Sequence, residues 1–113
     1  MTQEDKELLL KYLCAALPYG VKVRNVKMGF DIYDFNHNVK EIKTLIEEYN
    51  IKPYLRSMSS MTEKEHKEYE QWLPDGFNIN TVNWFLENQF DIMGLIPKGL
   101  AIEVTENNNP YKE

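Results

Sequence analysis

The densest run of reactive side chains is IKPYLRSMSSMTEKEHKEY, residues 51–69, where serines follow a basic, proline-bearing segment. A nucleophilic serine needs a neighbouring base and usually an acid that orients the base. The chain holds two histidines, His37 and His66, and neither lies in a recognisable nucleophile motif. We therefore predict no catalytic residue, and an enzyme is the less favoured alternative.

Two non-catalytic interpretations of this loop stay open. In the first, the amides of a helix start and nearby side chains hold a phosphate or carboxylate. The candidate anion-binding residues are Arg56, Ser59, Ser60 and Thr62. In the second, the loop is a connector whose hydroxyl groups satisfy free helix amides. Thr62 and Glu65 have capping-box spacing, which favours the connector.

A basic and aromatic pattern precedes the loop. Lys22, Arg24, Lys52 and Tyr54 could share one face of a sheet, as in proteins that bind single-stranded nucleic acid. Residues 20–60 carry seven Lys or Arg against five Asp or Glu, and the formal net charge of the chain is -5. Edge-strand lysines that discourage aggregation explain most of this small excess, so nucleic acid is not the expected partner.

Asp31, Asp34 and His37 lie three residues apart, a spacing that would gather metal ligands on one face of a helix. Their segment has the pattern of a strand, on which Asp31 and Asp34 point to opposite faces. The sequence also lacks a phosphate-binding glycine loop, a dinucleotide motif and zinc-ligand spacing. We predict no metal and no cofactor, and we expect Cys14 to be a buried, inert thiol.

The chain has 113 residues, which fit one domain. We expect a small α+β domain to position these residues. Apolar spacing predicts helices within residues 3–17, 36–50 and 63–73 and from about residue 80, and strands within residues 21–24, 30–34, 51–56 and 99–104. We expect a mostly antiparallel sheet packed on one face by amphipathic helices. The domain should span residues 1–105, with a flexible polar tail over 106–113.

The inward positions of three predicted helices should form one hydrophobic core. Its expected members are Leu9, Leu13, Leu17, Ile42, Leu45, Ile46, Phe85 and Leu86. In the last helix Trp84 falls nearly opposite the face that carries Val82, Phe85 and Leu86, because each residue turns a helix by ~100°. Either the thin helix over 63–73 covers Trp84, the alternative that we place first, or Trp84 is an exposed contact anchor. The candidate interface residues are therefore Trp84, Tyr69 and Trp72.

The N-terminal segment MTQEDKELLLKYLCAALPYG does not have the pattern of an export signal. Its first residues are acidic, and Lys11 interrupts the apolar run. Leu13 stands before Cys14 where cleavage of a lipoprotein signal would need a small residue. No apolar run approaches membrane-spanning length. We expect a cytoplasmic protein that does not associate with a membrane.

Three segments carry a family resemblance: LLLKYLCAALPYGVKV (8–23), IKPYLRSMSSMTEKEHKEY (51–69) and FDIMGLIPKGLAIE (90–103). The chain resembles small uncharacterised proteins encoded by gut anaerobic bacteria, their prophages and phages. The segment over 25–40 departs from the family pattern, which suggests a variable hairpin. The resemblance implies no assigned activity, and it favours an accessory protein of a phage or mobile element.

Together these patterns predict a non-enzymatic cytoplasmic module that binds another protein. One alternative is a small-ligand or anion-binding protein, or an enzyme, that uses the loop over residues 56–62. The other is a binder of single-stranded nucleic acid that uses the basic sheet face. The sequence gives no indication of the oligomeric state.

Overall fold

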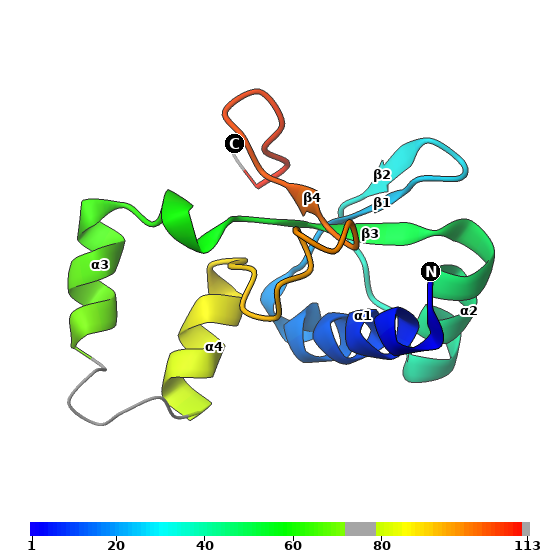
Figure 1. Cartoon of the computed structure of the whole chain (residues 1–113), viewed down its shortest axis with the longest axis horizontal. Coiled ribbons are helices and arrows are strands. Elements are labelled where there is room, and N and C mark those ends of the chain that lie inside the picture. Colours follow the sequence, from blue (N-terminus) through cyan, green and yellow to red (C-terminus); the bar gives the residue numbers. More distant parts are fainter. Residues whose placement is uncertain (72–78, 112–113) are drawn as a thin grey trace.

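The structure is a computed structural model that describes residues 1–71 and 79–111 (Figure 1). Its helices are α1 (Gln3–Ala16), α2 (Val39–Tyr49), α3 (Glu63–Glu70) and α4 (Ile79–Glu87), with short 3-10 helices η1 (Leu17–Tyr19) and η2 (Met58–Ser60). Its strands are β1 (Val23–Asn25), β2 (Phe30–Ile32), β3 (Ile51–Leu55) and β4 (Ile102–Glu103). The predicted α+β class and the order of elements are confirmed.

The four strands form one sheet in the order β2-β1-β3-β4. Strand β1 pairs antiparallel with β2, where Arg24 faces Asp31, and antiparallel with β3, where Arg24 faces Lys52. Strand β4 runs parallel to β3, with Tyr54 beside Ile102. The sheet is therefore mixed: mostly antiparallel as expected, with one parallel pair, because the long path through α3 and α4 returns β4 in the direction of β3.

The β1–β2 hairpin is closed by two local features of its sequence. The Asn25 side chain is buried, and its Oδ1 accepts a hydrogen bond of 2.9 Å from the backbone amide of Met28. Gly29 has a φ of +77°, which a residue with a Cβ adopts only at a cost. The Val26 and Lys27 amides also donate to the Asn50 and Tyr49 carbonyls at 3.2 and 3.3 Å, so the base of the turn is tied to the end of α2.

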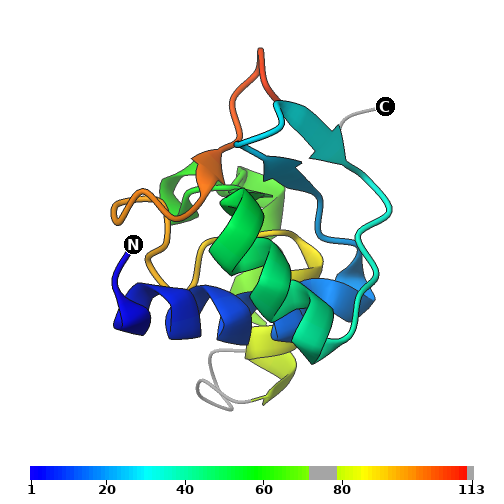
Figure 2. The same ribbon diagram turned by 90° about the vertical axis from the view of Figure 1, so that its right-hand side faces the viewer.

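Helices α1 and α2 lie side by side against one face of the sheet (Figure 2). Each begins at a side-chain cap: Thr2 accepts from the Asp5 amide, and Asn38 forms a capping box with Glu41. Helix α2 ends at Asn50, whose left-handed conformation turns the chain directly into β3. The two-layer arrangement of helices on one sheet face agrees with the sequence prediction.

The main core lies between these helices and the sheet. Leu9, Leu13, Ile42, Ile46 and Leu86 are buried in it as predicted, and Leu17 and Leu45 pack against it while partly exposed. The single-core prediction is wrong for Phe85, which lies in a second cluster with Trp84 and Phe90. The second cluster exists because α4 presents apolar side chains on two sides, one toward α1 and one toward α3.

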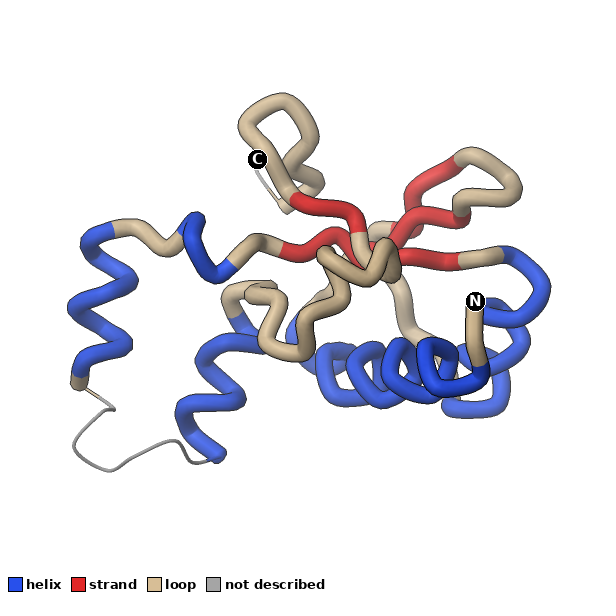
Figure 3. The backbone as a smooth tube through the Cα atoms, viewed as in Figure 1, coloured by secondary structure: helices blue, strands red, loops and turns tan. Residues whose placement is uncertain are grey.

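The chain after β4 folds back beside the sheet as far as Tyr111 (Figure 3). The Tyr111 hydroxyl accepts a hydrogen bond from the Lys22 amide at 2.9 Å and donates one to the Tyr54 carbonyl at 2.8 Å. It thereby bridges β1 and β3 where their ladder ends. The described part of the predicted flexible tail, residues 106–111, is thus in contact with the sheet.

Candidate functional site

Arg56, the only cation among the predicted anion-binding residues, is bonded inside the chain. Its two terminal nitrogens donate to the two carboxylate oxygens of Glu65, each at 2.6 Å. The guanidinium also lies 4.3 Å from the centroid of the Phe90 ring. Side-chain exposure is 22% for Arg56 and 15% for Glu65. The carboxylate of Glu65 therefore occupies the position where a bound anion would sit.

The bonds that Glu65 accepts change the pKa of its carboxyl group. The hydrogen bonds from Arg56 and from the backbone amide of Thr62 lower the pKa of Glu65 to about 2, against the opposing effect of burial. Glu65 stays ionised at neutral pH and completes the capping box with Thr62. The predicted capping box is confirmed. The Arg56–Glu65 pair joins the start of α3 to the residue that follows β3.

The hydroxyl groups of the loop are also engaged locally. The Ser60 hydroxyl donates to the Ser57 carbonyl at 2.7 Å, and the Ser57 and Ser59 hydroxyls are 3.1 Å apart. An open hollow of about 650 Å³ lies between this loop and the chain after β4. Its lining includes Arg56, Ser60, Thr62, Gln89, Val104, Thr105, Glu106, Asn109 and Tyr111. Three of the four predicted anion-binding residues, Arg56, Ser60 and Thr62, line this hollow. Their hydrogen bonds go to other groups of the loop and of α3, as expected for a connector.

The predicted nucleic-acid face is assembled, but its aromatic residue is covered. Arg24 and Lys52 are neighbours across the β1–β3 ladder, and Tyr54 follows on the same face. Tyr54 is only 3% exposed, and its hydroxyl donates to the Asp31 carboxylate. Stacking on a base needs an exposed ring face. Tyr54 therefore cannot act as a stacking platform in this conformation.

Two of the three cations of this face, Arg24 and Lys22, have acidic or carbonyl partners. Arg24 forms a 3.0 Å ion pair with Asp31. Burial disfavours the charge of Asp31, yet hydrogen bonds from Tyr54, Arg24 and Tyr33 outweigh that effect and lower its pKa. Lys22 donates to the Pro110 carbonyl at 2.8 Å, with its ammonium 4.9 Å from the Tyr33 ring centroid and 5.5 Å from that of Tyr111.

Trp84 is covered, as the first of the two sequence alternatives expects. It is 9% exposed and stacks on Phe90, with ring centroids 5.7 Å apart. Tyr69 of α3 lies over the same cluster, 6.2 Å from the Trp84 ring. The indole nitrogen donates to Glu68 at 3.3 Å. The third candidate interface residue, Trp72, lies outside the described residues.

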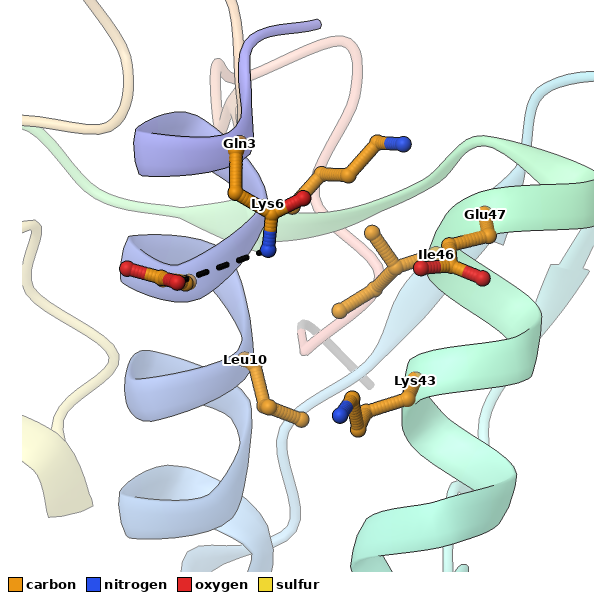
Figure 4. Close-up of a pocket in the computed structure, with 7 residues that line it drawn as sticks. Gln3, Lys6, Leu10, Lys43, Ile46 and Glu47 are labelled. Atoms are coloured by element: carbon orange, nitrogen blue, oxygen red, sulfur yellow. Dashed lines mark hydrogen bonds between the residues drawn. The ribbon is translucent and has the colours of Figure 1, made fainter.

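Enclosed space for a small molecule is scarce between the two sheet-covering helices. The hollow between α1 and α2 has a volume of about 90 Å³, and Figure 4 shows Leu10 and Ile46 facing each other across it. Ligand pockets usually measure about 300–1,000 Å³.

Within residues 1–71 and 79–111, no group of His, Cys, Asp or Glu has the arrangement needed to hold a metal ion. Among the described helices, none combines the length and apolar character of a membrane span.

Four of the eight large apolar side chains that are exposed among the described residues lie on the β1–β2 hairpin or directly after it, whereas the other four, including Ile79 at 68% exposure, lie on separate segments. Met28 is 61% exposed, Phe30 is 49% exposed and Tyr33 is 56% exposed, and Val26 is exposed beside them. Sequence reasoning did not select these residues. The available signal was the run of three bulky apolar residues, Val26, Met28 and Phe30, around a glycine turn.

Comparisons with protein-family models, curated proteins and solved structures find no match for the chain.

Proposed function

We propose that this protein is a non-enzymatic protein-interaction module that binds another protein through the β1–β2 hairpin. The observation that carries the proposal is the exposure of Met28 and Phe30 on a turn that projects from the sheet. A few residues usually supply most of the binding energy of a protein interface, and aromatic residues and Met are enriched at interfaces. We place its action in the cytoplasm.

The chemistry of the other surfaces supports this choice. Arg56 is bonded to Glu65 and Tyr54 is covered, so an anion or a stacked base would have to displace existing contacts. A partner could contact the exposed side chains of Met28 and Phe30, in contrast, without displacing a bond of this kind. The resemblance of residues 8–23, 51–69 and 90–103 to small phage-encoded proteins supports an accessory role in a phage or mobile element.

The experiment is site-specific photo-crosslinking in cells of the native host. A photoreactive phenylalanine analogue replaces Met28 in one sample and Lys64, an exposed residue of α3, in the control sample. We expect one discrete adduct with a second protein from position 28 and no such adduct from position 64. Identical adduct patterns from both positions would show that the hairpin is not a selective contact surface.

A pair of matched substitutions tests the side chains themselves. Phe30→Ser should remove the adduct formed from position 28, because it deletes the apolar ring on the hairpin. Val39→Ser is the control, since Val39 is 55% exposed on α2, away from the hairpin. Both variants should melt within a few degrees of the parent protein, because exposed substitutions cost little stability.

A further inference from the structure

Strand β2 is an edge of the sheet, and its outer side is unpaired. The sheet order ends at β2, which pairs only with β1 among the described strands. No backbone hydrogen bond joins residues 30–37 to any described residue outside the β1 ladder. Figure 2 shows the chain after β2 descending along the outside of the molecule to α2. A row of backbone donors and acceptors is therefore available to another strand.

A hollow runs beside this edge. It has a volume of about 590 Å³, and its lining includes Gly20, Ile32, Tyr33, Asp34, Phe35, Asn36 and His37. Six of these residues are consecutive: Ile32 ends β2, and the chain then bends at Tyr33 and Asp34 on its way to α2. An edge strand with a neighbouring hollow provides both parts of strand-addition binding: main-chain hydrogen bonds for affinity and space for alternate side chains.

The charge of the hollow indicates which side chains fit. Asp34 is exposed and lines it, and the lining residues in the described part of the chain include no lysine or arginine. His37, the other ionisable side chain besides Tyr33, lies 3.5 Å from Glu41. The Tyr33 ring already has the Lys22 ammonium 4.9 Å from its centroid, so Asp34 is the group of the hollow that favours a basic side chain. The whole chain carries a formal charge of -5, so a second copy would meet like charge, whereas a basic segment meets opposite charge.

We propose that β2 and the hollow beside it accept an extended, basic segment of the partner protein, which adds as a fifth strand. Its apolar residues alternate with Lys or Arg, one of which pairs with Asp34. This inference rests on the proposed function and specifies its binding mode. It requires the backbone edge of β2, whereas the proposed function requires only the hairpin side chains.

The test uses a synthetic probe, the acetylated and amidated peptide Arg-Val-Arg-Val-Arg-Val, with the full-length protein. Backbone amides are followed by NMR titration and hydrogen exchange. We expect the peptide to shift the amides of residues 30–35 and to slow their exchange at least tenfold. The same peptide N-methylated at every residue should not bind, because it lacks all ladder donors.

Two substitutions and a second peptide test whether the bound segment must be basic. Asp34→Asn should weaken peptide binding by about two- to fivefold, as expected for one exposed ion pair. Asp5→Asn, the same change at the start of α1, should leave the affinity unchanged. Equal binding of a Glu-Val-Glu-Val-Glu-Val peptide would refute the basic character of the segment.

The remaining outcomes are decisive for the binding mode. Absence of binding at millimolar peptide, or shifts confined to other elements, would overturn strand addition. Concentration-dependent shifts of residues 30–35 without peptide would identify a second copy as the occupant, which also overturns the proposal. A position-28 adduct in cells combined with unprotected β2 amides would retain the interaction module and refute only the strand-addition mode.

Discussion

The ion pair between Arg56 and Glu65 gives the sharpest stability prediction. The perturbation is Glu65→Gln, which removes the charge while an amide oxygen can still accept the Thr62 amide bond of 2.9 Å. The substitution therefore separates the charged, bidentate contact with Arg56 from the cap of α3. We expect a folded protein of lower stability, because Arg56 then keeps a partly buried charge without its counter-ion.

The magnitude follows from the pKa of Glu65, which is lowered from 4.5 to about 2. A shift of one pKa unit corresponds to ~1.36 kcal/mol, so the full shift would be worth about 3 kcal/mol. Solvent still reaches both side chains and screens the pair, which reduces the expected loss to about 1–2 kcal/mol at pH 7.

The pH dependence has a definite sign. Because the folded-state pKa is below the unfolded one, the contribution is fully present above pH 4.5 and is lost as the pH falls toward 2. Urea unfolding at several pH values would measure the difference between parent and variant. We expect this difference to shrink from its neutral-pH value to near zero at about pH 2.

The matched control is Glu63→Gln, an exposed residue in the first turn of the same helix. It should change stability by less than ~0.5 kcal/mol at every pH, as surface substitutions usually do. A Glu65→Gln variant as stable as the parent at pH 7, or a stability difference independent of pH, would refute the structural assignment of this pair.

Three further substitutions test single contacts by urea unfolding. Tyr111→Phe should cost about 1–3 kcal/mol, because the Lys22 amide loses its acceptor at the end of the ladder; a neutral result would show that the tail is not docked. Tyr12→Phe should be neutral or stabilising, since the Tyr12 hydroxyl is buried and forms no hydrogen bond within the described residues; a loss above ~1 kcal/mol would reveal a partner for that hydroxyl. Trp84→Ala should cost about 3–5 kcal/mol by emptying the cluster with Phe90; retention of full stability combined with loss of partner binding would instead support the exposed-anchor alternative.

Local sequence patterns were sufficient to predict most of the elements. Helix α2 follows from its apolar spacing, and α3 follows from the capping box of Thr62 and Glu65, because both signals act within a few residues. The helix predicted over 63–73 is observed as Glu63–Glu70, and residues 72 and 73 lie outside the described part of the chain. The α+β class needs only such local patterns.

The candidate site depended on contacts that no local pattern contains. The sequence correctly placed Arg56, Ser60 and Thr62 near one loop, but the nine-residue separation of Arg56 from Glu65 gave no sign of their bidentate pair. Similarly, Tyr54 was correctly placed on a sheet face with Arg24 and Lys52. Nothing in the sequence indicated that the Tyr54 hydroxyl is bonded to Asp31, or that the Tyr54 carbonyl accepts from Tyr111, which lies 57 residues further along the chain.

The sequence by itself determined the helices, their caps, the strand candidates and most of the main core, because periodicity and capping depend on neighbours in the chain. The tertiary structure alone decided which polar groups are already bonded and which apolar groups stay exposed. It also decided that α4 supports two clusters, that β4 runs parallel to β3 and that β2 is an edge. Those outcomes depend on which distant segments pack together, and burial is a property of the packed surface rather than of any residue type.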